Sequence, residues 1–183
     1  MIIGFAGKAG SGKSTAASYL TTHKGFTEYQ FALPIKECLA HLFGVPLSSF
    51  EDAAFKNSII PNTDVTYRHA MQTLGTDWGR NAISKDIWLL IAQQRLSQIK
   101  GNVVITDVRF DNEAQLIRSL GGYIIHIERT GSDYWNIREG NHESEAGITH
   151  EAGDLYIKNQ EGNIHAIYGE LARTLHLINA FNP

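Results

Sequence analysis

Residues near the start of the chain have types and spacing that predict phosphate binding. They form a Walker A pattern of two glycines, a lysine and a hydroxyl: Gly7-Lys8-Ala9-Gly10-Ser11-Gly12-Lys13-Ser14. Glycines let backbone N–H groups turn inward around a phosphate, and the helix that follows such a loop offers its positive N-terminus. Lys13 can reach the β- and γ-phosphates, and Ser14 can bind Mg²⁺. The alternative interpretation is a glycine turn with a solvated lysine.

An acidic residue after a later apolar run fits the other half of such a site. Asp107 follows residues 103–106 and can hold Mg²⁺ or its waters as a Walker B acid, although a strand-terminal aspartate is also a common helix cap. Arg109 and Glu113 come soon after, so all three can lie at the carboxyl edge of a parallel sheet, where open α/β folds bind ligands. The alternatives are a surface ion pair for Arg109 and plain helix-terminus electrostatics for Glu113.

Phosphoryl transfer between two anions requires cations that are positioned and not merely abundant. The candidates are Lys36, Arg68, Arg80, Arg109, Arg129 and Arg138. Arg68 and Gln72 share a helical face, so one can bind a phosphate and the other a base edge, unless the face is simply solvated. Trp88 lies beside an apolar helical pattern and either stacks on a nucleobase or belongs to the core.

A polar segment without clear periodicity follows the apolar run at residues 123–127. Arg129 and Arg138 flank it, and we expect a lid over about residues 129–150 that closes on the phosphates and excludes water. The segment includes His142-Glu143-Ser144-Glu145, whose spacing matches no zinc pattern. No metal other than Mg²⁺ is therefore expected.

Apolar runs that alternate with helical patterns predict an α/β fold with a mostly parallel sheet covered on both faces. The expected strands lie at residues 2–6, 29–32, 103–107, 123–127 and 155–157. The expected helices lie at residues 14–24, 35–43, 67–78, 86–99, 112–120 and 164–178. Asp111 is the expected N-cap of the helix at 112–120, and Trp78 belongs to the apolar stripe of the helix at 67–78. The weakly periodic segment 48–66 is interpreted as an insertion.

Composition and charge limit the classes of function. The 183 residues are 43% apolar and 19% charged, which is ordinary for a globular chain, and this length suits one domain over residues 1–183. A formal net charge of −3 provides no general basic surface, so no nucleic-acid partner is expected. No apolar stretch approaches the roughly 20 residues that cross a membrane. The single cysteine, Cys38, can form no internal disulfide, and the cytosol is the expected location.

Taken in order, these motifs resemble the deoxynucleoside monophosphate kinases of tailed bacteriophages, and the resemblance covers nearly the whole chain. Besides the Walker A loop, it rests on Phe31-Ala32-Leu33-Pro34-Ile35-Lys36, Met71-Gln72-Thr73-Leu74-Gly75-Thr76-Asp77, Trp88, Asp107-Val108-Arg109, Glu113, residues 122–129, residues 142–147 and residues 153–159. It is the order and spacing of these stretches together that is specific.

The resemblance implies a P-loop kinase-type three-layer sandwich with helical segments for acceptor binding, at about residues 33–100, and for the lid. It implies transfer of the ATP γ-phosphoryl group, with Mg²⁺, to the 5′-phosphate of a deoxynucleoside monophosphate. The implied ATP contacts are Gly10, Ser11, Gly12, Lys13, Ser14 and Thr15, with Asn159 near the adenine. The Walker A and Walker B patterns themselves, and not the resemblance, place Ser14 and Asp107 on the metal, because some family members carry an acid at the position of Ser14. The acceptor pocket comprises Lys36, Gly75, Thr76, Trp88, Asp107, Arg109 and Glu113, to which we add Arg68 and Gln72. We expect Lys13, Asp107, Arg109 and Arg129 to act in catalysis.

Other functions stay open at this point. P-loop kinases for phosphomevalonate and for dephospho-coenzyme A share the Walker loop and a segment like Phe-Ala-x-Pro. From another class, a nucleotide-controlled switch or motor ATPase also needs a phosphate loop, although the absence of an Asn-Lys-x-Asp sequence counts against a GTPase. A homodimer is left open, and a phage-encoded chain would act in the host cytoplasm.

Overall fold

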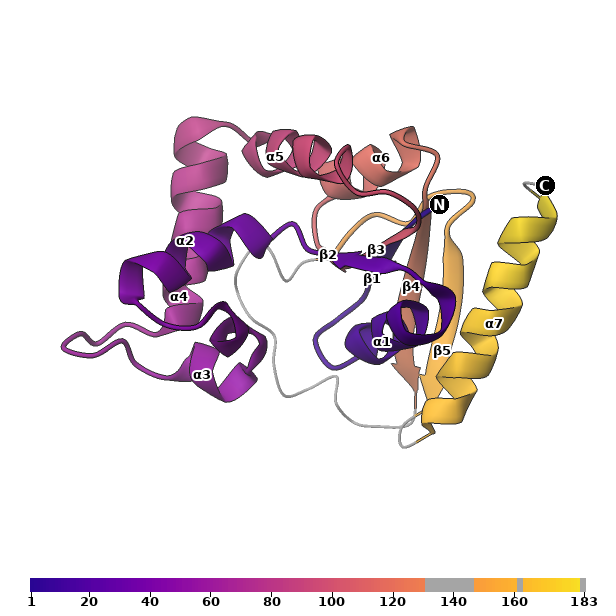
Figure 1. Ribbon diagram of the computed structural model, residues 1–183, viewed down its shortest axis with the longest axis horizontal. Coiled ribbons are helices and arrows are strands. Elements are labelled where there is room, and N and C mark those ends of the chain that lie inside the picture. The colour runs from indigo at the N-terminus through magenta and orange to yellow at the C-terminus, as the bar shows by residue number, and fades with distance from the viewer. Residues whose placement is uncertain (131–146, 161–162, 182–183) are drawn as a thin grey trace. The chain divides into compact units, whose positions relative to one another are not determined.

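The computed structural model describes residues 1–130, 147–160 and 163–181, which form two compact units (Figure 1). Unit 1 consists of residues 1–30 and 99–183, and unit 2 consists of residues 31–98. Each unit has an apolar core of its own. The single domain expected over residues 1–183 stays a prediction.

Unit 1 is built on a five-stranded parallel sheet. Its strands are β1 (Ile2–Ala6), β2 (Thr27–Tyr29), β3 (Val103–Val108), β4 (Tyr123–Thr130) and β5 (Leu155–Gln160). The strand order is β2-β3-β1-β4-β5, and every neighbouring pair is parallel. All five strands therefore end at the same edge. The central strands are apolar runs because both of their faces are buried, and the predicted parallel sheet is confirmed.

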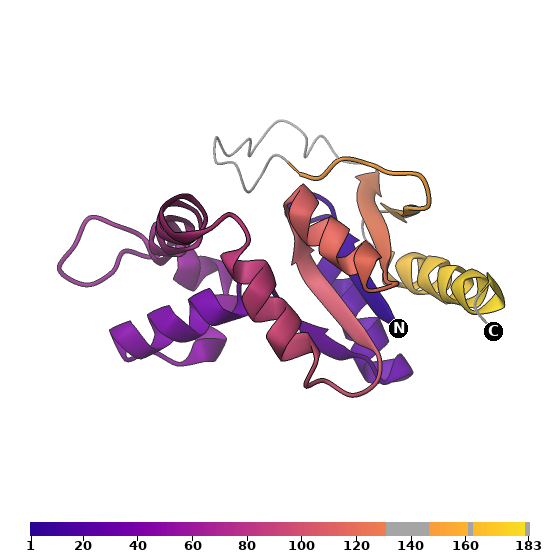
Figure 2. The ribbon, with the colours of Figure 1, turned by 90° about the horizontal axis from the view of Figure 1, so that it is seen from above.

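Helices cover both faces of this sheet (Figure 2). On one face, α1 (Lys13–Lys24) packs against β3, α7 (Ile164–Phe181) packs against β5, and the two helices contact each other. On the other, α6 (Asp111–Ser119) packs against β4 and β1. Side chains alternate along β1, so Ile3 and Phe5 enter the core with α1 and α7, whereas a Cβ at Gly4 would lie 2.6 Å from Cδ1 of Ile117 in α6. The three-layer arrangement is thus confirmed.

Unit 2 is helical throughout its described elements. It comprises α2 (Leu33–Phe43), the 3₁₀ helix η1 (Leu47–Glu51), α3 (Ala53–Asn57), α4 (Tyr67–Gln72), the π-helix η2 (Thr73–Ile83) and α5 (Ile87–Leu96). Its core gathers apolar side chains from most of these elements, with Leu39, Phe50, Tyr67 and Trp88 among the buried residues.

No helix among the residues that the structure describes is long and apolar enough to cross a membrane.

The segment at residues 48–66, interpreted as an insertion, contains α3 and all of η1 except its first residue. Phe50 is fully buried and meets the rings of Phe55 and Tyr67 edge-on, with centroid separations of 5.5 and 6.0 Å. An antiparallel bridge between Ile59 and Thr66 closes the segment. Three aromatic anchors thus hold short turns that are too brief to show a helical period, which explains why the sequence gives no periodic signal here.

Two predicted elements are corrected. The strand expected at 29–32 lies earlier, at Thr27–Tyr29, because Pro34 fits the first turn of α2 and residues 31–32 lead into that helix. The helix expected to run through 67–78 changes at Thr73 from α to π geometry, which shifts side chains away from the 3.6-residue period. Trp78, expected in the apolar stripe, is therefore 50% exposed.

A third correction concerns the start of α6. The N-cap is Phe110, and Asp111 is the first helical residue. The Asp111 carboxylate instead accepts hydrogen bonds from the backbone N–H and the hydroxyl of Thr149, at 2.6 and 3.0 Å. The aspartate thus serves a contact between distant segments, which local sequence patterns do not reveal.

Candidate active site

The phosphate loop lies between the end of β1 and the start of α1. Gly7, Gly10 and Gly12 have φ values of 141°, 78° and 108°, which place all three in a region that side chains rarely adopt. At Gly7 space is also lacking, because a Cβ would lie 2.4 Å from the carbonyl oxygen of Ile127. Gly12 is the N-cap of α1, so the loop leads directly into the positive end of that helix. The sequence places glycine where this backbone requires it.

Side chains hold the carbonyl groups of this loop. Lys13 Nζ donates to the carbonyl oxygens of Gly7 and Lys8 at 2.6 and 2.8 Å. Arg129 Nη1 donates to Gly10 O at 3.1 Å, and Asn159 Nδ2 donates to Ser11 O at 2.9 Å. Because the C=O and N–H of a trans peptide point in opposite directions, fixing the carbonyls turns the following N–H groups to the opposite side.

Ser11 supplies a second sign that the loop is shaped for a polar ligand. This residue is 4% exposed, and its hydroxyl oxygen has no hydrogen-bond partner among the described residues. Buried hydroxyls normally find a partner. Ser14 and Thr15 follow in the first turn of α1, so a hydroxyl suited to Mg²⁺ stands beside the loop. The hydroxyl groups, the backbone N–H groups and the glycine conformations of this loop therefore fit a nucleoside triphosphate with its metal.

Asp107 lies at the same edge of the sheet as the phosphate loop. It precedes the last residue of β3, and β3 pairs with β1 so that Val108 is the register partner of Ala6. Since Gly7 directly follows Ala6, the structure brings the end of β3 next to the start of the loop. This is the neighbourhood expected for a Walker B acid.

Arg109 lies on the turn between β3 and α6, and Glu113 holds this turn by hydrogen bonds. Glu113 is 3% exposed, and its Oε2 accepts hydrogen bonds from the backbone N–H groups of Arg109 and Phe110 at 2.8 and 3.2 Å. The carboxylate therefore satisfies donors at the start of α6, as in half of a capping box. Through these bonds it also fixes the backbone from which the Arg109 side chain extends.

The other acceptor candidates belong to unit 2. Lys36 is 5% exposed and its Nζ lies 2.7 Å from Oε1 of Glu51, while Arg68 Nε donates to Oδ1 of Asn57 at 2.8 Å. Gln72 ends α4. Thr76 is buried within η2, as is Gly75. The sequence candidates thus fall into one set in unit 1 and one in unit 2, each positioned by its own contacts.

Trp88 is closely packed within unit 2. It is 6% exposed and donates from Nε1 to the carbonyl oxygen of Gly75 at 2.7 Å. A Cβ at Gly79 would lie 2.5 to 2.8 Å from atoms of the indole. These contacts fit a core position for Trp88, which was one of the two interpretations of this residue. Through them Trp88 holds the π-helix that carries Gly75 and Thr76.

Of the expected lid, residues 129, 130 and 147–150 are described. Arg129 at its start contacts the phosphate loop, as given above. Arg138 and the stretch His142-Glu143-Ser144-Glu145 lie outside the described residues.

A buried polar cluster around Asp154 was not assigned a role from the sequence. The Arg118 guanidinium donates to both carboxylate oxygens of Asp154 at 2.8 to 3.1 Å, and His126 Nε2 lies 2.9 Å from Oδ2. Burial tends to raise the pKa of Asp154, but the hydrogen bonds from His126, the Glu151 backbone and Arg118, with the Arg118 charge, outweigh it and hold the pKa below its ordinary value. The cluster joins α6, β4 and the segment before β5.

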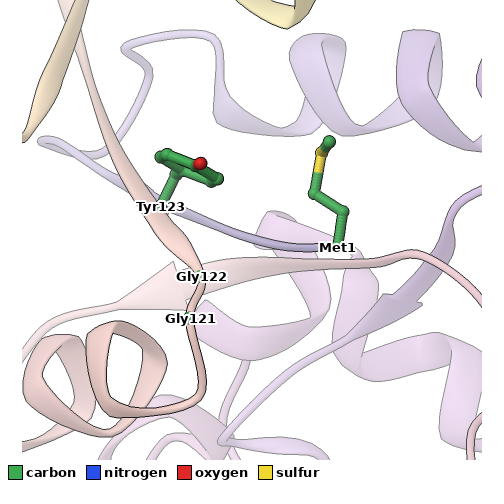
Figure 3. A pocket seen from close by; sticks show the side chains of 4 residues that line it. All are labelled: Met1, Gly121, Gly122 and Tyr123. Atoms are coloured by element: carbon green, nitrogen blue, oxygen red, sulfur yellow. The ribbon is translucent and has the colours of Figure 1, made fainter. Parts of the chain in front are cut away.

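A surface hollow elsewhere in unit 1 lies at the other end of the sheet. Met1, Gly121, Gly122 and Tyr123 line it (Figure 3). These residues stand at the amino ends of β1 and β4, whereas the phosphate loop follows the carboxyl end of β1. Ligands of open parallel sheets bind at carboxyl ends, so the phosphate loop and not this hollow is the candidate active site.

The class of protein follows from these observations. A phosphate loop after a central parallel strand, an acid at the end of the neighbouring strand and helices on both faces define a P-loop kinase fold. Shikimate kinase from Aquifex aeolicus vf5 superposes with a TM-score of 0.55 and 15% identity over 100% of both chains, a likeness that concerns the fold alone. A model of the deoxynucleotide monophosphate kinase family matches residues 44–171, and the chain belongs to this family.

Individual relatives carry the same family name. The chain is 37% identical over 148 residues to a protein of Acanthamoeba polyphaga mimivirus named "Putative deoxynucleotide monophosphate kinase", which covers 72% of this chain and 75% of that protein. It is 31% identical over 118 residues to the deoxynucleotide monophosphate kinase of Escherichia phage RB69, covering 62% of this chain and 46% of the phage protein. The chain is thus a kinase of the nucleoside monophosphate type, and the resemblance inferred from its motifs is confirmed.

Proposed function

We propose that the chain transfers the γ-phosphoryl group of ATP, with Mg²⁺, to the 5′-phosphate of a deoxynucleoside monophosphate and releases ADP and the diphosphate. The observation that carries the proposal is the geometry of the phosphate loop. Lys13, Arg129 and Asn159 hold carbonyl groups of this loop by hydrogen bonds, and Asp107 lies near its start, at the end of β3. The family membership and the names of the relatives support the acceptor class.

The residues of the loop have distinct roles in this proposal. Backbone N–H groups of residues 10–15 bind the ATP phosphates at the N-terminus of α1, and Lys13 leaves its contacts with Gly7 and Lys8 to neutralise the β- and γ-phosphates. Ser14 and Asp107 hold the Mg²⁺, directly or through water. Bound Mg²⁺ supplies charge neutralisation at the transferred group.

On the acceptor side, Arg109 binds the deoxynucleotide 5′-phosphate, and Glu113 positions Arg109 through the backbone. In unit 2, we assign acceptor binding to Lys36, Arg68 and Gln72 and to Gly75 and Thr76 of the π-helix, which Trp88 supports through its bond to Gly75. Arg129 acts at the start of the lid. Apart from Arg68 and Gln72, which are added because they share a helical face, these assignments follow the sequence positions that match the family motifs. Catalysis by this set of residues is mainly placement and charge neutralisation.

An acceptor panel tests the function. The purified 183-residue chain is incubated with Mg-ATP and one acceptor at a time (dAMP, dCMP, dGMP, dTMP, phosphomevalonate or dephospho-coenzyme A), and ADP formation is followed. We expect ADP formation that depends on at least one deoxynucleotide and yields the matching diphosphate. Turnover with none of the four deoxynucleotides would refute the proposal, and turnover with another acceptor would replace it.

A further inference from the structure

Asn159 contacts the phosphate loop through its side chain. It lies on β5, and its Nδ2 donates to Ser11 O at 2.9 Å. The same nitrogen lies 2.4 Å, and Cγ 3.3 Å, from the point where a Cβ of Gly12 would stand. The amide therefore touches two consecutive loop residues, one by a hydrogen bond and the other by close packing. The place near the adenine that the family resemblance implies for Asn159 stays a prediction.

The contact has a counterpart on the neighbouring strand. Arg129 on β4 is the register partner of Asn159 on β5, and it donates to Gly10 O. Two consecutive loop carbonyls, those of Gly10 and Ser11, are thus held from the ends of two hydrogen-bonded strands. Groups mounted on paired strands are positioned more rigidly than groups on loops.

Holding Ser11 O has a direct consequence for the ligand side of the loop. The carbonyl of Ser11 and the N–H of Gly12 belong to one planar peptide and point in opposite directions. Gly12 is the N-cap of α1, where N–H groups face outward from the helix and carry partial positive charge. A donor that fixes Ser11 O therefore fixes the direction of the Gly12 N–H as well.

We propose that Asn159 is a positioning residue, whose side-chain amide keeps the peptide between Ser11 and Gly12 in the orientation that presents the Gly12 N–H to a nucleotide phosphate. The inference deepens the proposed function and rests on the phosphate loop as the donor-nucleotide site. It names the polyphosphate, and not the base, as the part of the nucleotide that Asn159 serves.

Calorimetry with two probes separates a role of Asn159 at the polyphosphate from a role at the base. Mg-ADP and Mg-tripolyphosphate, which has no base, are titrated into the wild type and into Asn159→Ala. Loss of one hydrogen bond that orients the loop should weaken both probes to a similar extent, by about threefold to tenfold. In steady-state assays the KM for ATP should rise by a similar factor, while the KM for the deoxynucleotide changes less than twofold.

Two further variants complete the test. Gln160→Ala removes an amide side chain from the next position of β5, which points to the other face, and should leave both probes unchanged. Asn159→Leu keeps the approximate size of the side chain, removes the donor and adds no charge. Circular dichroism shows which variants fold, and Asn159→Leu replaces Asn159→Ala in the titrations if the alanine variant does not fold. Weaker ADP binding with unchanged tripolyphosphate binding, or unchanged binding of both probes, overturns the proposal. Neither titration needs an acceptor, so failure of the acceptor panel remains a separate result.

Discussion

Arg129 and Asn159 are register partners on the adjacent strands β4 and β5, and each donates a hydrogen bond to one of two consecutive carbonyls of the phosphate loop. The residues they hold, Gly10 and Ser11, lie 119 and 148 positions earlier in the chain. The local motif supplies a loop that is able to bind phosphate, and residues at the carboxyl ends of β4 and β5, distant in the sequence, hold its carbonyl groups.

The first prediction concerns the glycine that ends the loop. Gly12→Ala combines an unfavourable φ of 108° with a Cβ placed 2.4 Å from Asn159 Nδ2, so the loop or the Asn159 side chain must move and their contact is disturbed. We expect ATP binding by calorimetry to fall at least about tenfold, because this displacement costs more than the roughly 1 kcal/mol of left-handed strain alone.

Gly25→Ala is the matched control at the other end of α1. Its φ is 68°, but nothing lies within 4 Å of the added methyl group. It should lower the free energy of unfolding by about 1 kcal/mol and leave ATP binding unchanged. Equal loss of ATP binding in both variants would show that backbone strain, and not the contact with Asn159, controls the loop.

The second prediction concerns Lys13. Its ammonium group donates to Gly7 O and Lys8 O in the structure and is expected to neutralise charge that develops on the transferred phosphoryl group. Lys13→Ala should raise the barrier by about 2 to 4 kcal/mol, measured as a fall in kcat of roughly 30-fold to 900-fold. Lys24→Ala, at the far end of the same helix, should leave kcat unchanged. Turnover of Lys13→Ala within threefold of the wild type would remove this lysine from the mechanism.

The sequence predicts those parts of the site that depend on local spacing. The loop from Gly7 to Ser14 and the acid after the apolar run of β3 are each readable within a few residues, because glycine conformation and strand ends are local properties. The parallel sheet then brings Asp107 to the loop. The same reasoning identifies both faces of the sheet as covered.

The sequence does not predict contacts that depend on distant pairing. Asn159 carries no local mark of its bond to Ser11, and Asp111 reads as an N-cap although it binds Thr149. The π-helix is missed for another reason, since its first residues continue the period of α4. Such features need the tertiary structure, because the partners that stabilise them lie far apart in the chain or outside the 3.6-residue pattern.

The third prediction concerns the turn that carries Arg109. Arg109→Ala should weaken binding of the deoxynucleotide more than binding of ATP, since we place its guanidinium on the acceptor phosphate. Glu113→Ala removes the carboxylate that holds the backbone of Arg109 and should give the same acceptor-selective pattern, with the free energy of unfolding lowered by about 1 to 3 kcal/mol. Calorimetry with each ligand measures the split. Equal weakening of both ligands by Arg109→Ala would indicate a structural role for this arginine.

The fourth prediction concerns the packing of the π-helix. Gly79→Ala places a methyl group 2.5 to 2.8 Å from the Trp88 indole, so the ring or the helix must shift. We expect a loss of about 1 to 3 kcal/mol in the free energy of unfolding, from overpacking. In Gly169→Ala, within α7, the methyl group meets nothing within 4 Å and should stabilise the helix by up to about 1 kcal/mol. A neutral Gly79→Ala would show that Trp88 does not constrain the π-helix.

The fifth prediction concerns Asp154, whose carboxylate is 2% exposed between Arg118 and His126. Asp154→Asn removes the charge that compensates Arg118 and should lower the free energy of unfolding at pH 7 by about 3 kcal/mol. Glu151→Gln is the matched control, because Glu151 pairs with the same arginine but is 46% exposed. An exposed pair contributes about 0 to 1 kcal/mol, so the control should remain close to the wild type.

The pH dependence of this difference follows from the direction of the pKa shift. Because the pKa of Asp154 is lower in the folded state than its ordinary value of 3.8, its ionised form stabilises the fold at every pH above that value. This contribution is lost as the pH falls through the folded-state pKa. Denaturant unfolding at a series of pH values should therefore show the full gap between wild type and Asp154→Asn near neutrality and a shrinking gap below about pH 4. A gap that stays constant down to pH 3 would show that the carboxylate charge contributes nothing and that Arg118 and His126 hold Asp154 by shape alone.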